Sequence, residues 1–262
     1  MLKPFNVRII AVVLCLVPHG HWGVPNEREI RAGEPAARGS RAAENAAMPA
    51  EKHRPATLGN IRASRILFLG NSITLHGPSA AVGWSGNWGM AASAPERDYV
   101  HVLVSAIARI TGRQPEVIIE NIADFERHYD TYDARSKLEK HLAFKPDLVI
   151  VAIGENVPAL ASEPSRSAFR DRLANLLKMW KAQGDPTIVV QSCFWPDQTK
   201  DGILKQACAE VGGIFVDIGE LSKDESHYAR SERSYAHAGV AAHPGDKGMK
   251  AIAEAILEGL KK

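Results

Sequence analysis

Short apolar runs and longer amphipathic stretches alternate along the chain from residue 65 onward. Apolar runs of this length are typical of buried strands, and apolar residues repeating every three or four positions are typical of helices. The runs predict five strands, over 65–70, 116–120, 147–153, 187–191 and 213–217. The longer stretches predict five helices, over 98–113, 133–144, 165–183, 203–211 and 246–260.

This alternation of strand and helix predicts a mostly parallel sheet with helices on both faces. The run 147–153 is apolar at every position after Asp147, as expected for a strand that is covered on both sides. No internal repeat interrupts the pattern. The predicted fold class is therefore α/β: a three-layer α/β/α sandwich built on a parallel five-stranded sheet in one domain.

The first 61 residues have a different character. Lys3 and Arg8 precede an uncharged apolar stretch over 9–17, which is the pattern of a secretory signal peptide. An N-terminal helix or strand of the fold is the alternative, but the stretch is too short to span a membrane, which takes about 20 apolar residues. We expect a signal peptide over 1–24, a secreted or periplasmic protein, and no stable insertion into a membrane.

Residues 25–61 are rich in Ala, Arg, Glu and Pro and contain few large apolar side chains. Such a composition cannot bury enough apolar surface to offset the entropy of ordering, so we predict a disordered linker there. The folded domain is then expected over 62–262.

The composition also excludes some partners and cofactors. A net charge of +2, without clustered Lys and Arg, argues against a nucleic-acid partner. Cys15 falls in the expected leader, while Cys193 and Cys208 could pair in an oxidising compartment or stay as two buried thiols. No His or Cys pair has the spacing of a zinc site, so we expect neither a metal nor another cofactor.

A serine lies directly after the first predicted strand, in Gly70-Asn71-Ser72-Ile73-Thr74. Substrates of open α/β sheets bind outside the carboxyl ends of the strands, where backbone N–H groups can stabilise an oxyanion. A hydroxyl at that point can act as a nucleophile if a base reaches it. The alternative is that Ser72 caps a helix.

A candidate base lies near the other end of the chain, in His243-Pro244-Gly245-Asp246, just before the last predicted helix. A helix that packs back onto the sheet can bring this imidazole to the turn after the first strand. Because its ordinary pKa is near 6.5, histidine can take and return a proton at neutral pH. A surface or capping role is the alternative for His243.

Together these segments resemble the conserved blocks of the SGNH/GDSL hydrolases. The run 70–74 is similar to the first block of that family, and Asn121 is similar to the Asn that opens its second block. Gly154-Glu155-Asn156 is similar to the third block, G-x-N, and His243 with Pro244 is similar to the last. The resemblance covers residues 65–262, and its four short motifs occur in the family's order, each at the end of a predicted element.

The resemblance implies a flavodoxin-like fold and ester hydrolysis through an acyl-enzyme, with Ser72 as the nucleophile and His243 as its base. It further implies an oxyanion hole made by the backbone N–H of Ser72, a backbone N–H at Glu126 and the side-chain amide of Asn156. It includes many carbohydrate O-acetylesterases, which points to a small-molecule or polysaccharide ester as the substrate.

Three positions depart from the family's pattern. Val240 stands where the family has the Asp that orients the histidine, so either a backbone carbonyl or a carboxylate from elsewhere must hold His243. Glu126 replaces the Gly of the second block, and its charge would repel an oxyanion unless it points away. Val157 follows Asn156 where many members have Asp. These departures leave a non-catalytic homologue as an alternative.

Tryptophans mark two candidate contacts with the substrate. Trp84 and Trp88 lie in the long connection 76–97, and Trp195 follows the fourth predicted strand. Their flat faces suit sugar rings as well as acyl chains, although they could also pack the loops against the domain. Acidic residues after the second strand could bind hydroxyl groups or simply form a solvated loop. A lipid or short-chain acyl esterase and an O-acyltransferase are the alternative enzyme functions.

Overall fold

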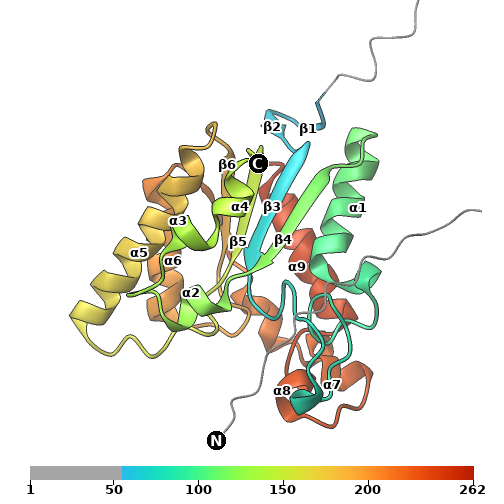
Figure 1. Cartoon of the computed structure of the whole chain (residues 1–262). Coiled ribbons are helices and arrows are strands. Elements are labelled where there is room, and N and C mark those ends of the chain that lie inside the picture. Colours follow the sequence, from blue (N-terminus) through green and yellow to red (C-terminus); the bar gives the residue numbers. More distant parts are fainter. Residues whose placement is uncertain (1–54) are drawn as a thin grey trace, which may run out of the picture. The chain divides into compact units, whose positions relative to one another are not determined.

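The structure is a computed structural model, and it describes residues 55–262 (Figure 1). Cys15, the expected signal peptide and all but the end of the expected linker lie outside the described residues. Within the described part, no helix is both long enough and apolar enough to cross a membrane.

The centre of the domain is a parallel sheet with the strand order β4-β3-β5-β6-β7. Its strands are β3 (Arg65–Gly70), β4 (Glu116–Asn121), β5 (Leu148–Ala152), β6 (Thr187–Gln191) and β7 (Ile214–Val216). The first strand of the sheet, β3, lies in its interior. Strand β4 is added on one side and β5, β6 and β7 on the other, which is the doubly wound order of flavodoxin-like folds. All five predicted strands are present, and the predicted fold class is confirmed.

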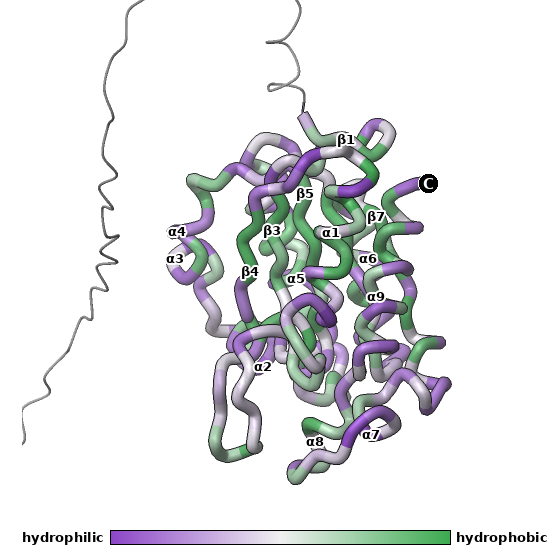
Figure 2. The backbone as a smooth tube through the Cα atoms, turned by 90° about the vertical axis from the view of Figure 1, so that its right-hand side faces the viewer, coloured by the Kyte–Doolittle hydropathy of each residue, from purple (hydrophilic) through white to green (hydrophobic). Residues whose placement is uncertain are grey.

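Helices cover both faces of the sheet (Figure 1). On one face lie α1 (Tyr99–Thr111) and α9 (Asp246–Gly259), and on the other lie α5 (Glu163–Lys181) and α6 (Gln198–Glu210). Figure 2 shows that the strands between the two helical layers are largely hydrophobic. Strand β5 is buried at every position, as its uninterrupted apolar run predicts.

Two predicted helices differ from the structure. The helix expected over 133–144 is divided into α3 (Ala134–Lys137) and α4 (Glu139–Leu142) at Leu138, a buried residue. Helix α6 begins five residues earlier than its apolar spacing indicates. The reason is Asp197, whose side chain accepts hydrogen bonds from the N–H groups of Thr199 and Lys200 and so caps the helix.

The fold also begins before residue 62, the expected start of the domain. Strands β1 (Thr57–Leu58) and β2 (Ile61–Arg62) form a small antiparallel hairpin, and Leu58 belongs to the core beneath α1. The prediction of a linker up to residue 61 was therefore wrong for this segment. The reason is that one buried leucine and one short antiparallel pairing are enough to order a segment whose average composition is polar.

The remaining elements are short and lie mainly in the connections. Helix α2 (Ala123–Arg127) follows β4, and α7 (Ala229–Glu232) and α8 (Ala238–Ala241) precede α9. Four 3₁₀ turns complete the described chain: η2 (Ala80–Val82), η3 (Pro95–Arg97), η4 (Gly219–Lys223) and η5 (Glu225–His227).

Both cysteines of the domain are buried and unpaired. Cys193 follows β6 and Cys208 lies on α6, and each is a free thiol. Of the two alternatives that the sequence left open, the structure therefore has two buried thiols.

Candidate active site

The turn after β3 is fixed by its own side chains. The side-chain oxygen of Asn71 accepts the N–H of Ile73 at 3.1 Å, and the hydroxyl of Thr74 is 2.8 Å from that of Tyr99 in the core. A side chain at position 70 would overlap Thr74, so the strand can meet this turn only with glycine. Among the described residues no acceptor takes the N–H of Ser72, which leaves that donor free for a ligand.

Ser72 and His243 lie in direct contact although 171 residues separate them. The Ser72 hydroxyl is 2.8 Å from Nε2 of His243, and Nδ1 of the same ring is 2.7 Å from the carbonyl oxygen of Gly239. Because a carbonyl can only accept, Nδ1 must carry the proton and Nε2 must offer its lone pair. The Ser72 hydroxyl therefore donates to His243, which is the arrangement of a nucleophile and its base.

The backbone on either side of His243 is held as firmly as its ring. Its N–H donates to the carbonyl of Val240 at 3.1 Å, and its own carbonyl accepts the N–H of Ala229 at 2.8 Å. The ring of Trp195 packs edge-on against the imidazole, with centroids 5.6 Å apart. Helices α7 and α8 and the loop after β6 thus fix the position of the base.

A buried carboxylate, that of Glu126, organises the other side of the site. It is fully buried and accepts hydrogen bonds from N–H groups of three residues. Its Oε1 accepts from the N–H of Gly154 at 2.6 Å, from the N–H of Asn156 at 3.2 Å and from Nδ2 of Asn71 at 3.2 Å, and its Oε2 accepts from Nδ2 of Asn156 at 2.8 Å. The loop after β5 is thereby tied to the nucleophile turn.

The comparisons with known proteins decide the family. The family model for GDSL-like lipases and acylhydrolases matches residues 68–251. The chain belongs to the GDSL-like lipase/acylhydrolase family. The match includes the four segments on which the resemblance rested, so that resemblance is confirmed.

One solved structure supports the fold of this GDSL hydrolase, and a second is reported as similar. A protein of Parabacteroides merdae that is described as a GDSL-like lipase shares 18% sequence identity with this chain, with a TM-score of 0.52. The match covers 77% of this chain and 97% of the other protein's chain. A family two carbohydrate esterase from Cellvibrio japonicus is 18% identical with a TM-score of 0.45, over 76% of this chain and 61% of its own. A search of curated protein sequences found no match.

Glu126 has a different part in this GDSL hydrolase from the one that the family pattern implies. We expected its backbone N–H to donate to an oxyanion, but that N–H lies 3.4 Å from the carbonyl of Ile122 and is used within the turn that begins α2. The side chain instead contacts Asn156, and Arg127 donates to Oδ1 of Asn156 at 3.1 Å. The donors available to an oxyanion are therefore the N–H of Ser72 and the second hydrogen of the Asn156 amide.

The amide of Asn156 is oriented by charge at both ends. Its nitrogen faces the Glu126 carboxylate and its oxygen faces the Arg127 guanidinium, so the amide dipole is aligned with the field of the two groups. Charge-assisted hydrogen bonds are about twice as strong as neutral ones, which makes rotation of this amide costly. A fixed donor needs no reorganisation when negative charge develops on a substrate.

Val240 occupies the position of the acid that GDSL hydrolases use to orient the histidine. Its side chain is buried in an apolar cluster with Trp84, Met90, Ala91 and Ala229. The carbonyl of Gly239 holds Nδ1 of His243 in place of a carboxylate. Of the two alternatives that the sequence left open, the structure therefore uses a backbone carbonyl.

Substituting Asp for Val240 should destabilise the protein rather than complete a triad. The new carboxylate would lie in an apolar cluster at a site that is 2% exposed, and burying a charge without a partner is costly. We expect a loss of at least about 2 kcal/mol of unfolding free energy, measured by urea denaturation. Val240→Ala is the matched control, since it removes packing without adding a charge. A variant Val240→Asp that is as stable as wild type would contradict this placement.

The surroundings of His243 predict the pH dependence of the reaction. Burial lowers its pKa, the Gly239 carbonyl opposes that shift, and the nearby imidazoles of His76 and His237 lower the pKa further. Because His243 must be neutral to accept the proton of Ser72, activity should persist below the ordinary pKa of about 6.5. The acidic limb of the kcat/KM profile is therefore expected below pH 6.5, measured on an activated acetyl ester. A limb above pH 7 would show a carboxylate partner for His243.

A second buried carboxylate, Glu155, was missed in the sequence. It accepts hydrogen bonds from Nδ2 of Asn71 at 2.6 Å and from the N–H of Phe194 at 2.9 Å. Burial and the neighbouring charge of Glu126 raise the pKa of Glu155 to about 7. The middle residue of G-x-N gave no indication of this contact, because the link to the loop after β6 exists only in the folded chain.

Asn121, the family's second-block residue, contacts the turn of the nucleophile rather than a substrate position. Its side-chain nitrogen donates to the carbonyl of Leu75 at 2.7 Å, and its oxygen accepts the N–H of Ala123 at 2.9 Å. It therefore joins the end of β4 both to the nucleophile turn and to the start of α2.

The three tryptophans proposed to contact substrate have different surroundings. Trp84 is 9% exposed and donates its indole N–H to the carbonyl of His76, so it packs the connection 76–97 against the domain. Trp88 is half-buried, lies edge-on to Trp84 and donates to the carbonyl of Ala92. Trp195 is half-buried and in contact with His243, which leaves it as the tryptophan that lies beside the reacting groups.

The acidic residues after β4 are divided among several tasks. Asp124 pairs with His128 on the surface and Asp133 caps α3, whereas Glu126 is buried in the site. A hollow of about 400 Å³ lies nearby, between the loop after α2 and α5, and includes Phe125, Tyr132 and Arg172 in its wall. Asp130 and Asp133 line it, whereas Ser72, Asn156 and His243 do not.

Proposed function

We propose that this chain is an exported serine esterase that removes O-acyl groups, O-acetyl groups foremost, from carbohydrates. The observation that carries the proposal is the contact between Ser72 and His243, in which the carbonyl of Gly239 sets the tautomer that makes His243 a base. Membership of the acylhydrolase family supports the reaction class.

In the proposed reaction, Oγ of Ser72 attacks the ester carbonyl carbon while Nε2 of His243 takes the hydroxyl proton. The N–H of Ser72 and the amide of Asn156 donate to the oxyanion, and losing one such donor typically costs about 10²–10³ in rate. Collapse expels the alcohol, which leaves with the proton from Nε2. A water molecule then gives a proton to Nε2 and attacks the acyl-enzyme, so that the acid departs and Ser72 regains its hydrogen.

The surface of the domain supports a polar substrate. Within residues 55–262 the one large hydrophobic side chain that is exposed is Ile110, and it lies on α1. An esterase for long acyl chains needs an apolar groove beside its nucleophile, whereas the residues around this site are Ser, His, Asn and Arg with Trp195. A small acyl group on a sugar hydroxyl fits those surroundings better, because sugars combine a flat apolar face with hydroxyl groups.

Export is part of the proposal and rests on the N-terminal sequence. Lys3 and Arg8 followed by the uncharged stretch 9–17 support a secretory signal peptide. Immunoblotting of the secreted, periplasmic and cytoplasmic fractions of cells that produce the full chain would test it. Retention of the uncleaved chain in the cytoplasm would overturn this part alone.

The substrate class is tested by measuring which acid the purified chain releases. We expect acetate from acetylated polysaccharides and no release of long-chain acids from lipid esters. Preferential release of long-chain acids would favour a lipid esterase, and acyl transfer to an added sugar without hydrolysis would favour an O-acyltransferase. A chain that neither hydrolyses esters nor reacts with a fluorophosphonate at Ser72 would be a non-catalytic homologue.

A further inference from the structure

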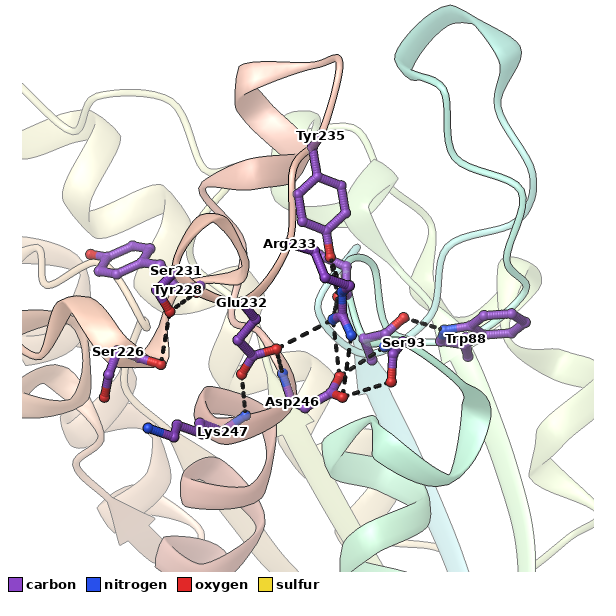
Figure 3. Close-up of polar contacts among 12 residues, drawn as sticks. Trp88, Ser93, Ser226, Tyr228, Ser231, Glu232, Arg233, Tyr235, Asp246 and Lys247 are labelled. Atoms are coloured by element: carbon purple, nitrogen blue, oxygen red, sulfur yellow. Dashed lines mark hydrogen bonds and ion pairs between the residues drawn. The ribbon is translucent and has the colours of Figure 1, made fainter.

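Five polar residues form a connected group beside the active site, which we name the Arg233 cluster: Arg233, Glu232, Tyr235, Asp246 and Ser93. Figure 3 shows the guanidinium of Arg233 beside the carboxylate of Asp246, with Ser93 on the other side of that carboxylate. Arg233 and Asp246 form two roughly parallel hydrogen bonds of 3.1 and 3.3 Å. Bidentate pairs of this kind fix orientation as well as distance.

One side of the cluster fixes the helix that follows the base. Asp246 is the first residue of α9 and lies three positions after His243. Glu232 accepts the N–H groups of Asp246 and Lys247 at 2.8 Å each, and so caps the start of α9 (Figure 3). Since α7 ends at Glu232 and its first residue, Ala229, holds the carbonyl of His243, both ends of this helix are tied to the base.

The other side of the cluster fixes the loop that holds the nucleophile. Arg233 and the hydroxyl of Tyr235 both donate to the carbonyl of Ala91, at 2.9 and 2.8 Å. Ala91 has a φ of 73°, a conformation that alanine rarely adopts and that must be held by its surroundings. Its neighbour Met90 donates its N–H to the carbonyl of Ser72 at 2.8 Å.

Ser93 closes the connection between the two sides. Its N–H and its hydroxyl donate to the two oxygens of Asp246, at 2.8 and 2.6 Å. The loop that hydrogen-bonds to Ser72 and the helix that follows His243 are therefore joined through the guanidinium of Arg233 and the carboxylate of Asp246. The position of His243 is therefore supported in two ways. The Gly239 carbonyl holds its ring directly, and the Arg233 cluster holds the backbone segments on either side of the site.

We propose that Arg233 is a positioning residue that keeps the imidazole of His243 in register with the hydroxyl of Ser72. The inference rests on the proposed function, because it assigns to Arg233 the alignment of that nucleophile and base. A carboxylate partner would align the imidazole directly; here the ring has only a dipole at Nδ1, and its alignment depends on the backbone around it. A planar guanidinium can bind Asp246 and the Ala91 carbonyl together, which a lysine ammonium cannot do with the same geometry.

The test compares Arg233→Met and Arg233→Lys with the control Arg230→Met. Arg230 lies three residues earlier on α7 and pairs with Glu225, at 2.6 and 2.7 Å, but has no hydrogen bond to Asp246 or to the loop that holds Ser72. Two quantities are measured: kcat per fluorophosphonate-reactive site, and the pKa of His243 by NMR of ¹⁵N-histidine-labelled protein. Comparison with His243→Gln assigns the resonance.

We expect Arg233→Met to lower kcat about 10–100-fold with KM within about twofold, because misalignment affects the chemical step more than binding. The groups that face His243 are the hydroxyl of Ser72, the indole of Trp195 and the imidazoles of His76 and His237. Loosening the ring among these groups admits water and relieves the effect of burial, so the pKa of His243 should rise toward its ordinary value. Arg233→Lys should be intermediate, and Arg230→Met should match wild type in both quantities.

A pKa and a kcat per site that are unchanged in Arg233→Met would overturn the inference and leave the proposed function intact. Equal changes in Arg230→Met would also overturn it, because they would show a general loosening of α7. Wild-type protein that neither hydrolyses acyl esters nor labels at Ser72 would overturn the proposed function. In that case an unaltered pKa of His243 in Arg233→Met would separately refute the positioning role.

Discussion

Replacing Ser72 with alanine should abolish ester hydrolysis, with a loss of kcat of at least about 10³-fold, while the fold stays intact. The hydroxyl is the group that His243 contacts at 2.8 Å, and no neighbouring hydroxyl occupies an equivalent place in that contact. Steady-state turnover of an activated acetyl ester measures the loss. Mass spectrometry after fluorophosphonate treatment should show a single adduct in wild type and none in the variant.

Ser85→Ala is the matched control for this experiment. Ser85 is exposed in the connection 76–97 and is not part of the site, so its replacement should leave turnover unchanged. Both variants should melt within about 2 °C of wild type, because neither hydroxyl supports the core. Retention of more than about a tenth of wild-type turnover by Ser72→Ala would rule out the acyl-enzyme mechanism.

Replacing Glu126 should cost both stability and activity. In Glu126→Ala, four N–H hydrogen bonds from Asn71, Gly154 and Asn156 lose their acceptor in a fully buried place. Leaving buried donors unsatisfied costs about 1–3 kcal/mol each before relaxation, so we expect a total loss of about 3 kcal/mol or more. Urea denaturation measures this loss, and kcat should fall about 10²-fold as the Asn156 amide loses its orientation.

Glu126→Gln tests whether the charge of Glu126 or its hydrogen bonding is needed, and Asp124→Asn is its matched control. Glutamine keeps one acceptor but turns an NH₂ group toward other donors, so Glu126→Gln should also be destabilised. Asp124 lies on the same short helix and is exposed, and Asp124→Asn should behave as wild type. If Glu126→Gln were instead more active at unchanged stability, the carboxylate would be a repulsive neighbour of the oxyanion and not the support of Asn156.

The sequence predicts the layers of this fold better than its connections. Strand β5 and its neighbours are recognisable because burial on both faces demands uninterrupted apolar runs, and α1 and α9 because one face of each is apolar. The hairpin at Leu58 escaped prediction, since a single buried side chain leaves no periodic pattern. The division between α3 and α4 at Leu138 escaped it as well, because helical spacing continues across the break.

The sequence likewise predicts only part of the candidate site. Ser72, Asn156 and His243 stand out because a strand end or a helix start fixes each of them within a short motif. The carboxylates of Glu126 and Glu155 do not, because their partners come from other strand ends and are brought together only by the sheet order. The carbonyl of Gly239 leaves no trace in the sequence at all, since every residue carries one.

The wide separation of Ser72 and His243 along the chain has a consequence for biosynthesis. A ribosome makes β3 before the other strands of the sheet, and a domain generally folds as a unit. The nucleophile is therefore made long before its base, and the carboxylate that anchors the loop around Ser72, that of Asp246, follows later still. A nascent or truncated chain that ends before His243 holds a serine without its base, so the proposed acyl-enzyme chemistry requires synthesis to continue past that residue.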